Sequence, residues 1–188
     1  MARLIFITHP EVVVDPECPV EDWPLSPHGI DRAKSFALSA VLKNVTQIWA
    51  SPERKAQETA TILSETLGVE VQIHPRLNEN DRTATGFLPP DQFEAAADAF
   101  FASPDHSFKG WETARDAQSR IVDAVMQISS SFGAGDIAIV AHGAVGTLLH
   151  CHLSQAPIDR AHDQPHQGHF WVADRPDLKP HHGWRSIG

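Results

Sequence analysis

The 188-residue sequence lacks tyrosine, has only two cysteines and contains no apolar run of the roughly 20 residues that a membrane-spanning helix needs. The cysteines, Cys18 and Cys151, cannot build a disulfide framework, which indicates a reducing compartment. The apolar part of the N-terminus is too short for a signal peptide and is followed at once by Pro10 and Glu11. We therefore expect a soluble, cytoplasmic protein with no membrane partner.

Positive charge is also scarce in this chain. It carries 15 Lys and Arg residues against 24 Asp and Glu residues, a net charge of −9 with histidine neutral. This balance excludes a general nucleic-acid binder, which needs a basic surface. It does not exclude an anionic small molecule, because the local charge of a pocket can oppose the net charge of the protein.

The length and composition favour one folded domain over residues 1–188. Its last part, about residues 157–188, is a tail rich in histidine and proline that contains late strands. The tail histidines fit no tight zinc template and have no cysteine nearby, so we expect no metal there.

Apolar runs and capping signals predict strands that alternate with helices. Strands are expected at residues 3–8, 45–50, 69–73 and 136–141, with later ones at 168–173 and 184–187. Helices are expected to start at Ser26, Ser51, Asp91, Thr113 and His142 and to run to about Lys43, Leu67, Ala102, Phe132 and Leu153. Alternation of this kind predicts an α/β fold, with a mainly parallel central sheet covered by helices on both faces.

Three of the expected strands end in residues that carry chemistry. The first ends in Thr8-His9, the second in Ser51 with Arg54 close behind, and the fourth in His142-Gly143. Parallel strands place their sites beyond their carboxyl ends. If the three strands are neighbours, two imidazoles and a guanidinium meet at one sheet edge, beside helix N-termini that favour a phosphate. The alternative is that each histidine is an ordinary polar residue at the end of a strand.

Five short motifs in order resemble the phosphoglycerate-mutase-like branch of the histidine phosphatase superfamily, nearly from end to end. They are Thr8-His9-Pro10 for Arg-His-Gly, Leu25-Ser26-Pro27-His28-Gly29 for Leu-Ser/Thr-x-x-Gly, Ser51 to Ala60 for Ser-x-x-x-Arg-Ala-x-x-Thr-Ala, Leu77-Asn78-Glu79 for Leu-x-Glu, and His142-Gly143 after an apolar strand. The resemblance implies the three-layer α/β/α sandwich of that family.

The same resemblance implies roles for single residues. His9 would become phosphorylated, Arg54 would hold the phosphate, and His142 would stabilise its oxygens with the backbone N–H of Gly143. Glu79 would give a proton to the leaving group and later activate water. These roles need no metal and no cofactor, and they imply a small phosphorylated substrate or inorganic phosphate as the partner.

The chain departs from the family pattern at the phosphate pocket itself. Thr8 replaces the motif arginine and offers one hydroxyl for phosphate binding where arginine offers a charge and several N–H groups. Loss of one such donor costs roughly 3 kcal/mol of transition-state stabilisation. Pro10 replaces the glycine, but its carbonyl can still accept the proton on the His9 ring. Asp15 stands where the family has an asparagine and would repel a phosphate that it faced.

A replacement cation is expected from the loops around these motifs. The candidates are Arg82, Arg76 and Lys55, and Arg82 is favoured because it follows Glu79 closely. The alternative for Arg82 is an ordinary solvated charge on a loop.

Two classes of function follow from this sequence. The first is a phosphomonoester hydrolase that works through a phosphohistidine on His9; a phosphoglycerate mutase is less favoured, because mutases of this family are longer. The second is a degenerate member that binds a phosphorylated ligand or a partner protein without turnover. Retention of His9, Arg54, Glu79 and His142 favours the enzyme, whereas Thr8 favours the binding module.

Overall fold

The computed structural model describes residues 2–130, 133 and 135–188. Its strands are β1 (Arg3–Thr8), β2 (Val45–Ala50), β3 (Val71–Ile73), β4 (Asp136–Ala141), β5 (His169–Asp174), β6 (Lys179–Pro180) and β7 (Arg185–Ser186). Its α-helices are α1 (Pro27–Ala37), α2 (Arg54–Leu67), α3 (Pro90–Ala102), α4 (Ala114–Ser129) and α5 (Gly143–Leu153). Short 3₁₀ helices lie at Val20–Asp22, Ala40–Leu42, Pro75–Leu77 and Arg160–His162.

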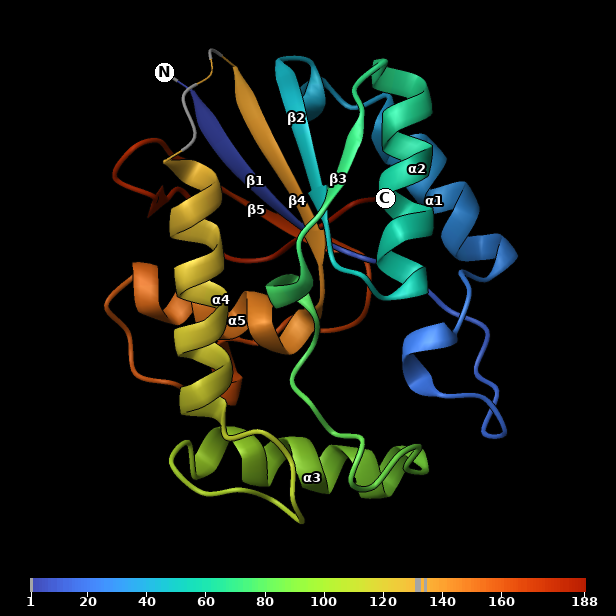
Figure 1. Cartoon of the computed structure of the whole chain (residues 1–188), viewed down its shortest axis with the longest axis vertical. Coiled ribbons are helices and arrows are strands. Elements are labelled where there is room, and N and C mark those ends of the chain that lie inside the picture. Colours follow the sequence, from blue (N-terminus) through green and yellow to red (C-terminus); the bar gives the residue numbers. More distant parts are fainter. Residues whose placement is uncertain (1, 131–132, 134) are drawn as a thin grey trace.

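The strands form one sheet in the order β3-β2-β4-β1-β5-β6, and β7 pairs with β5. Strands β1, β4, β2 and β3 run parallel to one another, whereas β5 runs antiparallel to β1. The predicted mainly parallel sheet is therefore confirmed. The three strands that end in candidate residues are neighbours, so their carboxyl ends meet at one edge (Figure 1).

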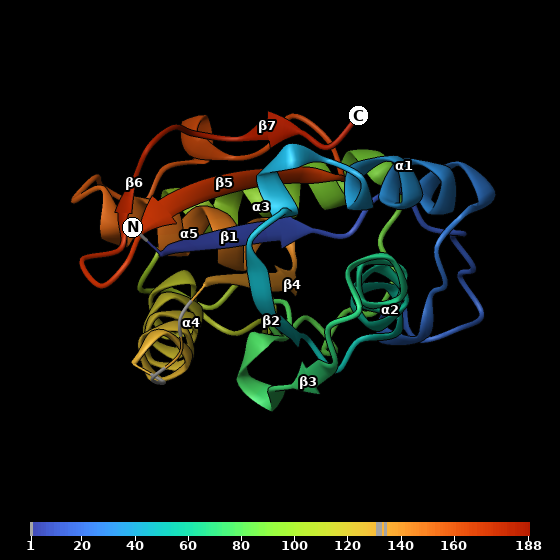
Figure 2. The same cartoon turned by 90° about the horizontal axis from the view of Figure 1, so that it is seen from above.

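Helices cover both faces of the sheet, and the side chains of β1 alternate between the two (Figures 1 and 2). Leu4 and Phe6 pack in a core with α4 and α5. Ile5 and Ile7 pack in a second core with α1 and α2. This is the predicted three-layer α/β/α sandwich.

The predicted start of α1 is confirmed, but the helix ends earlier than predicted. Ser26 caps it, because its hydroxyl accepts the backbone N–H of Gly29 at 3.0 Å. The helix ends at Ala37, and a separate 3₁₀ helix follows at Ala40–Leu42. The break comes where Ser39 has extended dihedrals and caps that next turn.

Helix α2 begins at Arg54, three residues later than predicted from Ser51. Glu53 keeps extended dihedrals as its N-cap, and its N–H donates to the Ser51 hydroxyl at 3.2 Å. The fourth helix begins after its predicted cap, Thr113, and extends to Ser129; its predicted end at Phe132 lies outside the described residues.

The C-terminal part of the chain is integral to the sheet. The predicted late strands correspond to β5 and β7, and sequence analysis missed the two-residue strand β6. Trp171 in β5 is fully buried and stacks on Phe6 of β1, with ring centroids 5.1 Å apart. The expected His- and Pro-rich tail therefore supplies core as well as surface.

Helix α3 lies beyond the carboxyl ends of the parallel strands (Figure 1). Arg160 ties it to the rest of the molecule through ion pairs with Glu94 and Asp98. In the described part of the chain, no helix combines the length and apolar character that a membrane span requires.

Candidate active site

His9 and His142 come together at the carboxyl edge of the sheet. Each follows a strand directly, and the strands pair in parallel register with Thr8 opposite Ala141. The backbone N–H of His9 donates to the Ala141 carbonyl at 3.2 Å, which extends that pairing by one residue. The two imidazole centroids are 5.3 Å apart, with the rings inclined at 66°.

A cavity of about 430 Å³ opens over His9. Lys55, Glu79 and Gly143 line it near the sheet edge, and Phe93, Phe100 and Trp111 also line it. Since Phe93 and Phe100 belong to α3, this helix closes the cavity from above the strand ends. The cavity is thus lined by the His9 imidazole and by aromatic rings.

The His9 ring has the protonation that a nucleophile needs. Its Nδ1 lies 2.9 Å from the carbonyl oxygen of Pro10, which can only accept, so Nδ1 carries the proton and Nε2 keeps its lone pair. Burial, with a contribution from the Lys55 ammonium, lowers the pKa of His9 to about 4. The imidazole is therefore neutral at pH 7.

His142 is fully buried beside the start of α2. Its Nε2 lies 2.7 Å from the hydroxyl of Ser51 and 3.3 Å from a carboxylate oxygen of Glu53. Among the described residues its Nδ1 has no hydrogen-bond partner. Burial lowers the pKa of His142 well below its ordinary value, even though Glu53 opposes the shift, so this ring is also neutral at pH 7.

The structure does not bring Arg54 to the two histidines. The Arg54 guanidinium is half exposed and pairs with Glu58 one helical turn on, at 2.8 Å. The buried cation beside His9 is Lys55, whose ammonium donates to Glu53 and to the Val20 carbonyl. Successive helical residues point about 100° apart, so only one of these two neighbours can face the cavity.

The motif spacing itself could have identified Lys55. In the family pattern quoted above, arginine stands four residues after serine and directly before alanine. Counted from Ser51, that position is Lys55, which precedes Ala56. The expectation for Arg54 rested on residue type instead of spacing.

Glu53 is a site residue that sequence analysis missed. One carboxylate oxygen accepts the N–H of Glu79 at 2.8 Å, and the carboxylate also pairs with Lys55 and His142. Burial by itself raises the pKa of Glu53, but His142 and Lys55 outweigh burial and lower it to about 2. An ionised carboxylate therefore neutralises the ammonium of Lys55 inside the site.

Glu79 lies at the N-terminus of α5 with its carboxyl group in the cavity. Its oxygens accept the N–H groups of Ala144 at 3.2 Å and Val145 at 3.1 Å. Burial raises the pKa of Glu79, and the positive charge of Arg82 opposes that shift. A carboxyl group with a raised pKa is suited to hold a proton and donate it.

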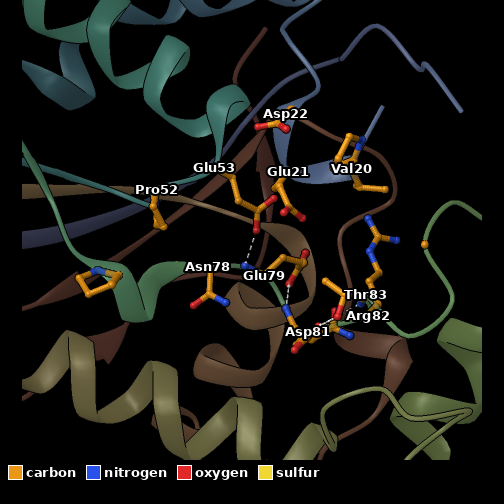
Figure 3. A pocket seen from close by; sticks show the side chains of 14 residues that line it. Val20, Glu21, Asp22, Pro52, Glu53, Asn78, Glu79, Asp81, Arg82 and Thr83 are labelled. Atoms are coloured by element: carbon orange, nitrogen blue, oxygen red, sulfur yellow. Dashed lines mark hydrogen bonds between the residues drawn. The ribbon is translucent and has the colours of Figure 1, made fainter. Parts of the chain in front are cut away.

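A second pocket, of about 700 Å³, adjoins the His9 cavity and shares Glu79 and Arg82 with it. Figure 3 shows Glu53 and Glu79 side by side in this pocket, joined by the hydrogen bond described above. The Arg82 guanidinium carbon lies 4.8 Å from the centre of the Phe93 ring. Of the proposed replacement cations, Arg82 and Lys55 thus lie at the cavity.

The remaining predicted residues lie elsewhere. Arg76 pairs with Asp123 on the surface at 3.0 Å. Asp15 accepts the N–H of Glu17 in an exposed turn. Thr8 is fully buried at the end of β1 and does not line the cavity. Gly143, by contrast, lines the cavity.

Metal ligands are not grouped in this part of the molecule. In residues 2–130, 133 and 135–188, no cluster of three or more His, Cys, Asp or Glu side chains could hold a metal ion. The site therefore consists of two neutral imidazoles, a buried ammonium paired with an ionised carboxylate, a carboxyl group with a raised pKa and a helix N-terminus. Groups of these types can accept and release a phosphoryl group.

A family model, the histidine phosphatase superfamily (branch 1), matches residues 4–172. A curated relative from Hydrogenobacter thermophilus, named "Putative phosphoserine phosphatase 2", is 28% identical over 141 residues, covering 71% of this chain and 68% of that protein.

Solved structures of similar fold cover nearly the whole chain. Bacillus stearothermophilus YhfR is 23% identical with a TM-score of 0.80, over 96% of this chain and 95% of that one. A mycobacterial glucosyl-3-phosphoglycerate phosphatase with inorganic phosphate is 22% identical with a TM-score of 0.78, over 98% and 95%. A phosphoserine phosphatase from Entamoeba histolytica with 3-phosphoglyceric acid is 18% identical with a TM-score of 0.78, over 99% and 98%.

The α/β fold and the groups in the site are those of a protein suited to phosphoryl transfer. The chain belongs to the histidine phosphatase superfamily, branch 1. This family assignment, together with the phosphatase-named relative from Hydrogenobacter thermophilus, supports a phosphatase of the histidine phosphatase type.

Proposed function

We propose that the protein hydrolyses small phosphomonoesters through a phosphohistidine intermediate on His9. The observation that carries this proposal is the state of the His9 ring: the Pro10 carbonyl holds the Nδ1 proton, and a low pKa leaves Nε2 free at the cavity. A neutral imidazole in a pocket that also contains a buried ammonium is a competent phosphoryl acceptor.

In the first step, Nε2 of His9 attacks phosphorus, and the bond from phosphorus to the ester oxygen breaks. The leaving oxygen takes the proton of the Glu79 carboxyl group, so an alcohol departs and Glu79 becomes a carboxylate. Lys55 and the backbone N–H of Gly143 stabilise the non-bridging oxygens, since both line the cavity beside His9.

In the second step, water attacks the phosphohistidine and gives its proton to the Glu79 carboxylate. The bond from nitrogen to phosphorus breaks, inorganic phosphate leaves, and neutral His9 is restored. Glu79 thus serves as acid and then as base, and its raised pKa supports both roles.

The low positive charge of the site favours the second function, a phosphate-binding module without turnover. The motif arginine is absent, and Glu53 pairs with Lys55, so positive charge at the site is partly neutralised. Loss of one preorganised donor lowers the rate by about a hundredfold or more without abolishing ligand binding.

Phosphate release separates the two functions. Wild type and the His9→Ala variant are incubated with p-nitrophenyl phosphate, phosphoserine and 3-phosphoglycerate, with the exposed His28→Ala as a matched control. We expect release by wild type and His28→Ala and a loss of about a thousandfold or more in His9→Ala. An acid-labile phosphoprotein should form in wild type but not in His9→Ala. Equal background release by wild type and His9→Ala would leave the binding module as the function.

A further inference from the structure

Thr8, at the position before His9, binds the side chain of a residue far along the chain. The Thr8 hydroxyl accepts the backbone N–H of His169 at 2.9 Å. Its own proton has two acceptors in reach, Oε1 of Gln164 at 2.8 Å and the His169 carbonyl at 3.2 Å. The shorter contact is with Gln164, so the hydroxyl orients this amide with its oxygen toward Thr8.

The nitrogen of the same amide then lies over the start of α5. A Cβ placed on Gly143 would come within 2.4 Å of Nε2 of Gln164, so the amide occupies the space that this glycine leaves free. Gln164 also lines the cavity over His9. Among the described residues none accepts a hydrogen bond from its Nε2, whereas Oε1 accepts one from Thr8.

The backbone of Gln164 is fixed as well as its side chain. Its N–H donates to Oδ1 of Asp163 at 2.8 Å, and the same oxygen accepts the hydroxyl of Thr147 on α5 at 2.8 Å. The 163–164 segment is thereby held on the helix whose N-terminus faces the cavity. A donor held at both ends binds an oxyanion with little loss of side-chain entropy.

We propose that Gln164 is a phosphate ligand that takes the place of the missing motif arginine, and that Thr8 is the positioning residue that aims its Nε2. The role as a substrate ligand rests on the function proposed above. An amide donates through N–H groups without bringing a charge, so it recognises the tetrahedral oxygens of a phosphomonoester by geometry. Gln164 supplies the donor and Thr8 fixes its direction, so the two residues together take over the role of the arginine.

The test measures affinity for inorganic phosphate by calorimetry, which requires no turnover. The variants are Gln164→Leu, the isosteric Gln164→Glu, and Gln127→Leu, an exposed glutamine of α4 outside the cavity, as a control. We expect Gln164→Leu to weaken phosphate binding about tenfold and Gln164→Glu to weaken it further by repulsion. Gln127→Leu should stay within about twofold of wild type, which is the scatter of a neutral change. Thermal unfolding of each variant excludes loss of fold as the cause.

The Thr8 variants test the positioning role. Thr8→Val removes the hydroxyl and should weaken phosphate binding, Thr8→Ser should restore it, and Thr8→Val in the Gln164→Leu background should add nothing. The proposal is overturned if Gln164→Leu binds phosphate as wild type does, or if the two losses add in full. It is equally overturned if wild type binds no phosphate. Failure of His9 to form a phosphoprotein would remove the proposed catalysis but leave this result standing.

Discussion

The carboxylate of Glu53 lies 3.3 Å from Nε2 of His142 and pairs on its other side with the ammonium of Lys55. Since the pKa of Glu53 is lowered to about 2, a negative charge stays beside the proposed phosphate position at any pH of physiological interest. This charge opposes the binding of a phosphate dianion and weakens the cation that should attract it. We therefore expect Glu53 to limit the phosphate affinity of the site.

The Glu53→Gln variant tests this relationship. The amide removes the negative charge and keeps one acceptor oxygen, so it can still accept from Lys55 or from the Glu79 N–H, but not from both at once. We expect phosphate to bind about tenfold more tightly and the KM for p-nitrophenyl phosphate to fall in proportion, since several kcal/mol of repulsion at close range is only partly screened. Glu21→Gln, an exposed carboxylate in the adjoining pocket, serves as the control and should change neither value. Unchanged affinity in Glu53→Gln would mean that the charge of Glu53 does not act on the phosphate.

The contributions of Lys55 and Arg54 to phosphate affinity can be distinguished by making the same substitution at each position. Lys55→Met should weaken phosphate binding by about tenfold to a hundredfold, because a hydrogen bond to a charged group contributes roughly 1.5–3 kcal/mol. Arg54→Met should change it by less than about threefold, as expected for a half-exposed side chain in a surface ion pair.

Lys55→Met also leaves Glu53 without its buried partner, which destabilises the fold. The double variant Glu53→Gln with Lys55→Met removes both charges and should recover most of the lost stability while still binding phosphate weakly. The midpoint of thermal unfolding and the phosphate affinity, measured side by side, separate the two effects. If Arg54→Met has the larger effect on affinity, the assignment of Lys55 is contradicted.

Most of the fold could be predicted because its signals are local. Short apolar runs mark β1, β2 and β4, and Ser26 and Thr113 cap their helices as their side chains suggest. Alternation of strands and helices then leaves few arrangements other than a covered parallel sheet. The two-residue strand β6 was missed, since it forms by pairing with β5 and has no pattern of its own.

The site could be predicted only in part, and the physical reasons differ. His9, His142, Glu79 and Gly143 follow strands or motifs, so neighbouring strands suffice to bring them together. Which of Arg54 and Lys55 faces the cavity depends on where α2 begins, and the N-cap at Glu53 decides that. Gln164 reaches Thr8 across 156 positions of sequence, through a loop contact that no periodicity encodes.

The pH dependence of kcat/KM follows from the shifts at His9 and Glu79. His9 must be neutral to attack, and its pKa is lowered to about 4, so activity should be lost only as pH falls through about 4 and not through 6.5. Glu79 must be protonated to donate, and burial raises its pKa, so activity should fall as pH rises past that raised value. We therefore expect an optimum on the acidic side.

The Glu79→Gln variant checks the alkaline limb of that profile. It should lose about a hundredfold or more in rate with a poor leaving group, and the part of the limb due to Glu79 should vanish. Ionisation of the substrate itself also shapes this limb, but that contribution persists in the variant. An acid limb near 6.5 in wild type would contradict the neutral, buried His9.

Restoring the motif arginine is expected to need space as well as charge. Thr8 is fully buried, and Gln164 fills the volume between it and Gly143, so Thr8→Arg alone forces a larger side chain into a filled region. Overpacking of this kind costs about 1–3 kcal/mol, and we expect a lower unfolding midpoint with no gain in activity.

Thr8→Arg combined with Gln164→Gly opens that volume. Its kcat/KM should exceed that of Gln164→Gly by about a hundredfold, the usual contribution of a preorganised donor to a developing anion. Steady-state kinetics with p-nitrophenyl phosphate, together with thermal unfolding of all three variants, makes the comparison. A gain in Thr8→Arg alone would show that Gln164 yields its place freely, and no gain in the double variant would show that the residue before His9 does not reach the phosphate in this chain.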